Sequence, residues 1–372
     1  MSIPNLPQEY QNAINNGLVS CRKHPIDDLW ILNYTQECQF SKTWNDVTLQ
    51  CRGLIVNADG TPVARPFQKF FNLSEHDNPD FPRIPYGTPF KAFEKMDGSL
   101  GVSYVSSRGW EIATRGSFES EQAMKATQML NTTYAHLVPK LNQKWTYLFE
   151  IIYSENRIVV DYGKEEKLVL LGVIRTSDDT EFSLEDFADL GFPLPRVFEI
   201  QDLDSLPRDI QNFEGYVVRF DNGMRVKVKL DDYVRMHKLM TGITPNRVWE
   251  MLAAGQDVRS FIADLPDEMY DEVIDVVEDI QAERDSLFNL HVVNFQSLQL
   301  ENLSRKEQAA KILDLCRRSQ TEPAVGEFII PLNSGILFML LDNRADWAKE
   351  KMWNLVKPKN GNKLICKADL QG

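Results

Sequence analysis

Four lysines are the residues whose type and spacing best fit chemistry. Lys95 opens the segment Lys95-Met-Asp-Gly-Ser-Leu100, directly before a predicted hairpin. The simplest interpretation is a turn, because Asp-Gly reverses a chain and leaves the lysine in solvent. A lysine amine becomes a nucleophile when neighbouring cations and partial burial lower its pKa. Lys227 and Lys229 alternate along a predicted strand, so both project from one face. Together with Lys69 they are candidates for the neighbouring cations that would act on Lys95.

The Lys95 segment is one of an ordered set of short motifs. In chain order the others are Gln50-Cys-Arg52-Gly-Leu54, Lys69-Phe-Phe-Asn-Leu73, Thr114-Arg115-Gly-Ser117, Phe149-Glu150-Ile151, Asn156-Arg-Ile-Val159, Leu171-Gly-Val-Ile174, Glu214-Gly-Tyr-Val217 and Lys-x-Lys-x-Asp-x-Tyr233. The set resembles the phage RNA ligase 1 family, within the covalent nucleotidyltransferase superfamily of ATP-dependent ligases and capping enzymes. The resemblance covers about residues 30–235.

The resemblance implies an ATP-dependent RNA ligase that joins 5′-phosphate and 3′-hydroxyl RNA ends. Lys95 would attack the α-phosphate of ATP and store the activation as a lysyl-AMP phosphoramidate. AMP would then pass to the RNA 5′-phosphate, and the 3′-hydroxyl would displace it. A divalent metal is expected to offset charge on the transferring phosphorus, Mg²⁺ first and Mn²⁺ as the alternative. RNA repair is the implied setting, with tRNA as a candidate substrate.

The resemblance also assigns roles to individual residues. It gives the catalytic set as Lys95, Glu150, Glu214, Lys227 and Lys229, and the ATP-binding set as Tyr34, Arg52, Lys69, Lys95, Arg115, Glu150, Leu171, Val217, Lys227 and Lys229. Within these sets, Glu150 would bind the ribose hydroxyls, Leu171 and Val217 would contact the two faces of the adenine, and the lysine and arginine side chains would bind phosphates. Glu214, with Asp257, would bind metal. The chain departs from the family at three places: a one-residue insertion between Tyr34 and Arg52, arginine for the usual lysine at 115, and an incomplete acidic pair at Asp257.

Two other functions remain open. A DNA ligase or an RNA-capping guanylyltransferase would use the same lysine, but those enzymes usually continue into an OB-fold after the Lys-x-Lys motif. Here the sequence after Lys229 is typical of helices. A non-catalytic RNA-binding relative is expected to lack at least one catalytic position, and none of the five is missing. The ligase interpretation is therefore favoured.

The elements that must position these residues divide the chain in two. Residues 1–235 carry predicted hairpins at 54–64, 101–114 and 216–229, strands at 145–152 and 168–174, and a helix at 120–130. The fold class is thus α+β: an antiparallel-sheet nucleotidyltransferase domain of the ATP-grasp-like ligase type, followed by an all-α domain at 236–372. We expect helices at 245–262 and 335–356, and one starting at Ser304. Trp347, Met352 and Trp353 are predicted core residues, and the helical domain is a candidate RNA-specificity module.

Composition and charge set the remaining limits. The 372 residues carry a formal charge of −13, but the predicted acidic helix at 257–285 accounts for nine of those charges, so a basic cleft elsewhere is compatible with an RNA partner. No apolar run reaches the length of a membrane span, and no secretion signal is visible. Five cysteines without a Cys-x-x-Cys pair indicate a reducing, cytoplasmic location. A separate kinase–phosphatase that heals RNA ends is a candidate partner.

Overall fold

Two units make up the chain, Met1–Met240 and Thr241–Gly372. The structure, a computed structural model, describes residues 4–234, 237, 242–258, 267–320 and 331–358. The sequence places the boundary at 235/236, five residues before the division between the units.

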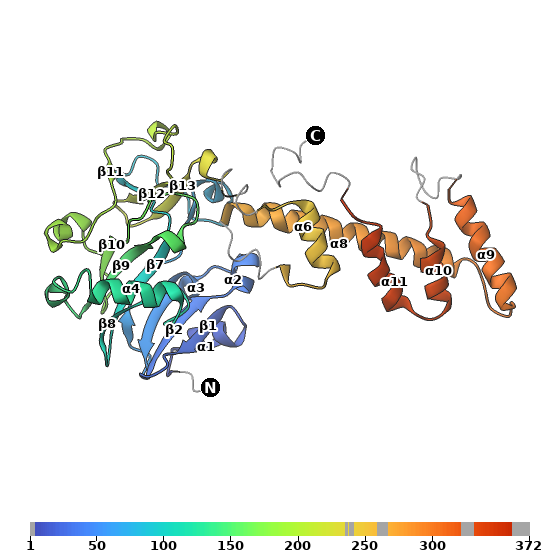
Figure 1. Ribbon diagram of the computed structural model, residues 1–372, viewed down its shortest axis with the longest axis horizontal. Coiled ribbons are helices and arrows are strands. Elements are labelled where there is room, and N and C mark those ends of the chain that lie inside the picture. The colour runs from blue at the N-terminus through green and yellow to red at the C-terminus, as the bar shows by residue number, and fades with distance from the viewer. Residues whose placement is uncertain (1–3, 235–236, 238–241, 259–266, 321–330, 359–372) are drawn as a thin grey trace. The chain divides into compact units, whose positions relative to one another are not determined.

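Three sheets form the N-terminal unit (Figure 1). In order across each sheet, they are β1(Val19–Lys23)-β2(Leu29–Tyr34)-β3(Arg52–Asn57)-β4(Pro62–Ala64), β10(Lys167–Arg175)-β9(Trp145–Ile152)-β7(Ser99–Ser106)-β8(Gly109–Thr114), and β11(Val197–Phe198)-β6(Phe90–Glu94)-β12(Gly215–Phe220)-β13(Arg225–Lys229)-β5(Phe71–Asn72). Neighbouring strands pair antiparallel, except β13 and β5, which are parallel. The unit is thus a mixed α/β structure with antiparallel sheets, and the three predicted hairpins are present.

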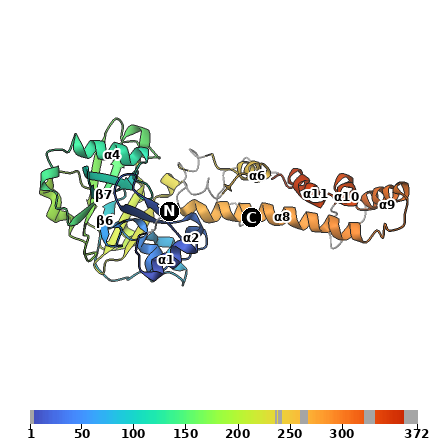
Figure 2. The same cartoon turned by 90° about the horizontal axis from the view of Figure 1, so that it is seen from below.

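Short helices cover these sheets. They are α1(Gln8–Asn15), α2(Gln36–Phe40), α3(Asp46–Gln50) and α4(Glu121–Asn131). The predicted helix at 120–130 is α4, which begins where the Ser120 side chain accepts a hydrogen bond from the backbone N–H of Ala123. It packs on β8, β7 and β10, whereas α1 packs on β1. Figure 2 shows α4 and α1 on opposite sides of the unit.

The alternation of side chains along β9 separates a core face from a site face. Tyr147, Phe149 and Ile151 project into one core cluster, together with apolar residues of α4. The other face carries Leu148, which packs between the first two sheets, and then Glu150. The strand is buried on both sides, so Glu150 is a carboxylate in a largely apolar setting, 9% exposed.

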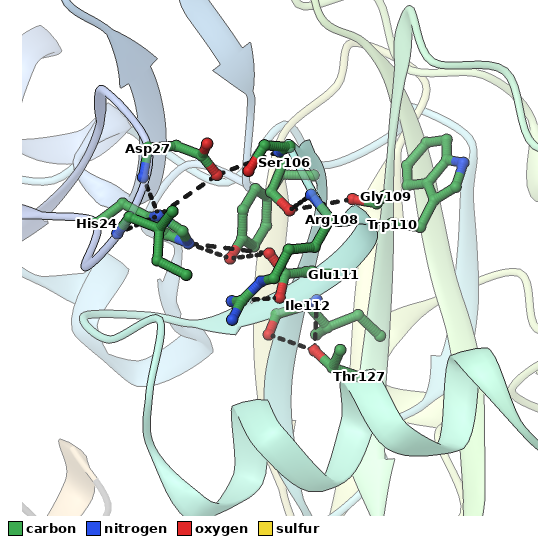
Figure 3. Close-up of polar contacts among 12 residues, drawn as sticks. His24, Asp27, Ser106, Arg108, Gly109, Trp110, Glu111, Ile112 and Thr127 are labelled. Atoms are coloured by element: carbon green, nitrogen blue, oxygen red, sulfur yellow. Dashed lines mark hydrogen bonds and ion pairs between the residues drawn. The ribbon is translucent and has the colours of Figure 1, made fainter.

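A polar cluster joins the turn after β1 to the β7–β8 hairpin (Figure 3). The His24 imidazole is buried, and its Nδ1 accepts the backbone N–H of Asp27 at 2.9 Å. Its Nε2 lies 3.2 Å from the Tyr104 hydroxyl. The guanidinium of Arg108 donates to Glu111 Oε1 at 2.7 Å in the same cluster. Burial lowers the pKa of His24 below its usual range. The cluster therefore holds a neutral histidine and fixes the first sheet to the second.

The described elements of the C-terminal unit are helices. They are α6(Pro245–Ala253), α8(Asp267–Gln296), α9(Arg305–Arg318), α10(Ser334–Leu341), α11(Ala345–Lys351) and a 3₁₀ turn at Met352–Asn354. The capping box predicted at Ser304 starts α9, and α6, α10 and α11 pack on α8. The helix predicted at 245–262 is too long, because α6 ends at Ala253 and residues 254–257 are not helical; residues 259–262 lie outside the described residues.

Several further sequence predictions for this unit were wrong in part. Met352 and Trp353 are buried as predicted, but the Trp347 side chain is 61% exposed with the Arg344 guanidinium 5.0 Å from its ring centroid. The single helix predicted at 335–356 is divided into α10 and α11 by a turn at 342–344, and this interruption changes the face on which Trp347 lies. The acidic helix predicted at 257–285 is described from Asp267 onward and extends to Gln296, so Asp257 precedes it. No helix within the described ranges is long and apolar enough to cross a membrane.

Candidate active site

Lys95 lies in the short connection between β6 and β7, and two neighbours hold it. Its backbone N–H donates to the carbonyl of Gly215 at 2.8 Å, which ties the connection to the start of β12. Its ammonium Nζ lies 2.7 Å from Glu214 Oε2. Lys229 of β13 reaches the other carboxylate oxygen, Oε1, at 3.4 Å. One buried carboxylate thus bridges two lysines.

This arrangement adds a carboxylate to the cationic environment predicted for Lys95, since Lys229 reaches the same carboxylate. The nearest charge that the structure gives its ammonium is the carboxylate of Glu214, whose side chain is 3% exposed. Burial raises the pKa of Glu214, and the positive charges of Lys95 and Lys229 oppose that rise. The sequence missed the pairing because Glu214 and Lys95 are distant in the chain and no local pattern links them.

Glu150 is the second buried carboxylate of the site. Its Oε1 accepts the backbone N–H of Gly98 at 2.9 Å. Burial raises the pKa of Glu150 to about 8, with further contributions from Glu214 and Asp97, while Lys95 opposes the rise. Gly98 has to be glycine, because an added Cβ would lie 2.6 Å from the carbonyl oxygen of Ile151. The turn and the strand therefore approach closely enough to bring Glu150 beside the Lys95 segment.

Asp97 is a residue of this site to which the sequence gave no role. Its Oδ2 accepts the backbone N–H groups of Val159 and Val160 at 2.8 and 2.7 Å, and its Oδ1 accepts the Tyr233 hydroxyl at 2.7 Å. Its own N–H donates to the Tyr162 hydroxyl at 2.9 Å. Asp97 thus fixes the Lys95 turn to two distant segments. The only feature of the sequence that pointed to such a role was its position in the Lys-x-Asp-Gly motif.

The strand β13 presents its basic residues on one face, as predicted. Val226 and Val228 are buried in the core of the third sheet, so Lys227 and Lys229 project to the opposite side. In the ladder, Lys227 lies opposite Val217 of β12 and beside Asn72 of β5. The parallel β5–β13 pair therefore brings the Lys69–Asn72 segment next to the two lysines.

The other cations expected to bind nucleotide lie against aromatic rings. The Arg52 guanidinium is 5.3 Å from the Phe70 ring centroid, and Lys227 Nζ is 5.9 Å from the same ring. Arg115 donates to the Tyr34 hydroxyl at 3.0 Å and lies 5.3 Å from the Tyr34 ring centroid. The pairs Arg52–Lys227 and Arg115–Tyr34 are thus each assembled from distant parts of the chain.

Leu171 and Val217, expected around an adenine, have different surroundings. Leu171 is the extra residue of a β-bulge, because Leu170 pairs with Phe149 and Gly172 with Leu148. It packs against a small cluster that includes Met96, next to Lys95. Val217 lies half-buried on β12. The bulge turns Leu171 toward the residue that follows Lys95.

The described residues offer one well-placed carboxylate for a metal ion, Glu214. Asp257 is exposed and belongs to the C-terminal unit, and within the described ranges no group of three or more His, Cys, Asp or Glu side chains could hold a metal ion. Mg²⁺ in nucleotide sites commonly uses one or two carboxylates, with phosphates and water supplying the remaining ligands. A single buried carboxylate therefore fits a metal that arrives with a triphosphate.

Comparison with known proteins identifies the family of this chain. A family model described as RNA ligase matches residues 50–239, just over half of the chain and almost all of the site above. The class is therefore that of a ligase, an enzyme that joins two molecules. The chain belongs to the RNA ligase family of the phage RNA ligase 1 type.

Individual relatives support the same family. The RNA ligase of Rhodothermus phage RM378 is 24% identical in an alignment of 320 positions that covers 66% of this chain and 72% of the relative. A putative bifunctional polynucleotide kinase/RNA ligase of Autographa californica nuclear polyhedrosis virus is 24% identical in an alignment of 351 positions that covers 86% of this chain but only 49% of that protein. A solved putative ATP-dependent DNA ligase from Aquifex aeolicus is 14% identical with a TM-score of 0.45, covering 90% of this chain and 98% of that one. At that TM-score the likeness carries no inference.

Proposed function

We propose that this protein is an ATP-dependent RNA ligase that seals 5′-phosphate and 3′-hydroxyl ends through a lysyl-AMP on Lys95. The observation that carries the proposal is the Lys95–Glu214 contact at 2.7 Å, inside the region that matches the family. A nucleophilic amine must first lose a proton. Glu214 has a raised pKa and touches the ammonium, so it is the group placed to accept that proton.

Three transfers complete the reaction. The Lys95 amine forms a bond to the α-phosphorus of ATP, and pyrophosphate leaves with the electrons of the broken P–O bond. An oxygen of the RNA 5′-phosphate then attacks the AMP phosphorus and releases the lysine amine. Finally the 3′-hydroxyl attacks the RNA 5′-phosphate and AMP leaves. The chain's part in each transfer is to orient phosphates and to move protons.

The remaining site residues have roles that follow from their setting. Glu150, protonated below about pH 8, can both donate to and accept from the ribose hydroxyls. We assign phosphate contacts to Arg52, Lys69, Arg115, Lys227 and Lys229, and contacts to the adenine faces to Leu171 and Val217. Once Glu214 has passed the Lys95 proton on to solvent, its carboxylate would be able to join Mg²⁺ or Mn²⁺, and such a metal would supply charge neutralisation on the phosphates.

The substrate proposal is RNA, with cleaved tRNA as the specific candidate. The Autographa californica relative is described as both a kinase and a ligase, which supports coupling of sealing to end healing. We therefore propose a separate enzyme that prepares 5′-phosphate ends for this one. The four described cysteines are free thiols, which supports action in the reducing cytoplasm.

The test is covalent labelling with ATP carrying a radioactive α-phosphate, in the presence of Mg²⁺. We expect label on the wild type that survives denaturing electrophoresis, and none on Lys95→Ala. Lys91→Ala is the matched control, because Lys91 is an exposed lysine on β6 that pairs with Glu185 at the surface. Labelled Lys91→Ala with unlabelled Lys95→Ala assigns the nucleophile.

Other outcomes of the same experiment would redirect the proposal. Label from GTP but not from ATP would favour capping chemistry. Label from neither would favour an RNA-binding protein that retains the fold. Sealing of DNA ends in preference to RNA ends by the labelled enzyme would favour a DNA ligase.

A further inference from the structure

Three aromatic rings enclose the ammonium of Lys69. Its Nζ lies 5.5 Å from the ring centroid of Tyr34, 5.4 Å from Trp44 and 5.4 Å from Phe71, and the residue is 8% exposed. The rings also pack edge to face on one another: Tyr34 and Trp44 have centroids 5.1 Å apart, and Trp44 and Phe71 5.4 Å apart. We call Tyr34, Trp44 and Phe71 the Lys69 cage.

The cage acts on both the charge and the conformation of Lys69. The negative face of an aromatic ring attracts an ammonium, most strongly for tryptophan, and the attraction grows when water is excluded. A free lysine side chain samples many rotamers, and each must be given up when it binds a phosphate. Packing against three rings removes most of that freedom before any ligand arrives.

Three segments of the chain build this cage. Trp44 precedes α3, whose first turn is closed by an Asn45–Thr48 capping box. The carbonyl of Leu49 in the same helix accepts the backbone N–H of Lys69 at 2.8 Å. One short helix therefore fixes both the Trp44 ring and the Lys69 backbone, while β2 and β5 supply Tyr34 and Phe71.

The cage also sets the place of Lys69 relative to the other cations. The Tyr34 ring that contacts Lys69 carries Arg115 as well, and its hydroxyl accepts from that guanidinium at 3.0 Å. Phe71 pairs with Val226 in the ladder that carries Lys227. Lys69 is thus aligned through shared rings and a shared ladder with two cations that the proposed function assigns to phosphates.

We propose that Trp44 is a positioning residue that pre-orients Lys69 for the ATP phosphates. The proposal rests on the proposed function, in which Lys69 contacts nucleotide. Trp44 acts before lysyl-AMP forms, so its loss should weaken the use of ATP and leave the sealing of RNA that already carries a 5′-adenylate unchanged. This separation distinguishes a positioning role from a general effect on the fold.

The kinetic test compares three variants of the full chain. We expect Trp44→Leu to raise the KM for ATP in lysyl-AMP formation by about tenfold, with Trp44→Phe recovering most of the loss. Trp145→Leu is the matched control, because Trp145 is also half-buried and packs on the rings of Phe182 and Phe187. An equal effect of Trp44→Leu and Trp145→Leu, or an equal loss of sealing of adenylated RNA, would overturn the positioning role.

A second measurement reads the cage without any nucleotide. In protein labelled with ¹³C-lysine, ring currents should shift the ε-CH₂ resonance of Lys69, which Lys69→Arg identifies by its disappearance. Trp44→Leu should move that resonance toward the position of exposed lysines, and Trp44→Phe should keep it shifted. An unmoved resonance in Trp44→Leu would refute the cage even if wild type is labelled by ATP. A wild type that ATP does not label would refute the proposed function and leave this spectroscopic result standing.

Discussion

Two buried carboxylates, Glu150 and Glu214, dominate the site at the scale of single residues. Each has a raised pKa because burial disfavours its charged form. Glu214 is compensated by two lysines, whereas the Glu150 carboxylate accepts a hydrogen bond from the backbone N–H of Gly98. The site therefore carries a destabilising element that function retains, and its cost should depend on pH.

We expect Glu150→Gln to change the pH dependence of stability. The carboxyl group has a reference pKa of 4.5 and a folded pKa of about 8, so its contribution to stability is complete below pH 4.5 and is lost as pH rises through 8. The amide does not titrate. Between pH 5 and 9 the unfolding free energy of the wild type should fall by about 1 kcal/mol or more relative to Glu150→Gln.

Urea denaturation across that pH range measures the difference directly. Parallel stability curves for wild type and variant would contradict the burial argument. The amide can still donate to and accept from the ribose hydroxyls, so the stability curve, rather than lysyl-AMP formation, is the measurement that reports the titration of the carboxyl group.

The sequence predicted site residues better than it predicted their contacts. Lys95 and Glu214 are recognisable because each lies in a short motif, but their pairing depends on a sheet that joins β6 to β12. Asp97 was visible only as a turn former, since its three acceptor contacts come from segments far along the chain. Trp44 had no local signal, because a ring that encloses a cation leaves no spacing pattern.

At the scale of elements, the β12–β13 hairpin carries more of the site than any other element. It supplies Lys227 and Lys229, and it begins at Gly215 directly after Glu214. Gly215 has a φ of +148°, and an added Cβ would overlap the carbonyl oxygen of Val228 and lie 2.8 Å from Lys229 Cα. Its carbonyl also accepts the Lys95 N–H. Glycine is therefore required at position 215, where the Lys95 segment meets the β12–β13 hairpin.

We predict that Gly215→Ala destabilises the protein by about 2 kcal/mol or more and abolishes labelling by ATP. Gly223→Ala is the matched control in the same hairpin: Gly223 has a φ of +89°, but a Cβ there would meet open space. It should cost about 1 kcal/mol from backbone strain alone and keep its labelling. Thermal unfolding and ATP labelling of both variants check this, and equal behaviour would show that the close approach has no role.

Elements with a local signal were predicted, and those without one were not. The hairpins ending at β4, β8 and β13 follow from glycine turns between β-rich runs. The short strand β5, by contrast, has two residues and owes its strand conformation to pairing with β13. The order of strands in the three sheets depends on long-range packing, so no sequence pattern revealed it.

At the scale of the whole molecule, the two units have separate cores. The C-terminal unit packs Ile312, Cys316, Leu332 and Leu337 together, independent of the sheets of the N-terminal unit. Every proposed nucleotide contact lies in the N-terminal unit, whereas Asp257 lies in the other. Adenylate formation is therefore proposed for the N-terminal unit, and recognition of RNA by the C-terminal unit stays a prediction.

We predict that a protein made of residues 1–240 still becomes labelled by ATP on Lys95. Its sealing of tRNA broken in a loop should fall about tenfold or more relative to the full chain, because the candidate recognition unit is missing. Labelling and sealing assays on the two proteins test this. A fragment that folds but takes no label would place an essential adenylylation residue after position 240.

The parallel contact between β5 and β13 has a consequence for biosynthesis. It joins Phe71 to Val226, roughly 150 residues apart, and closing a loop of that size is an entropic cost that local hairpins do not bear. The hairpin β7–β8 can form as soon as it leaves the ribosome, but a nascent chain that ends before residue 225 lacks the partner strand and both of its lysines. The capacity to capture nucleotide is thus acquired late, after most of the N-terminal unit has been synthesised.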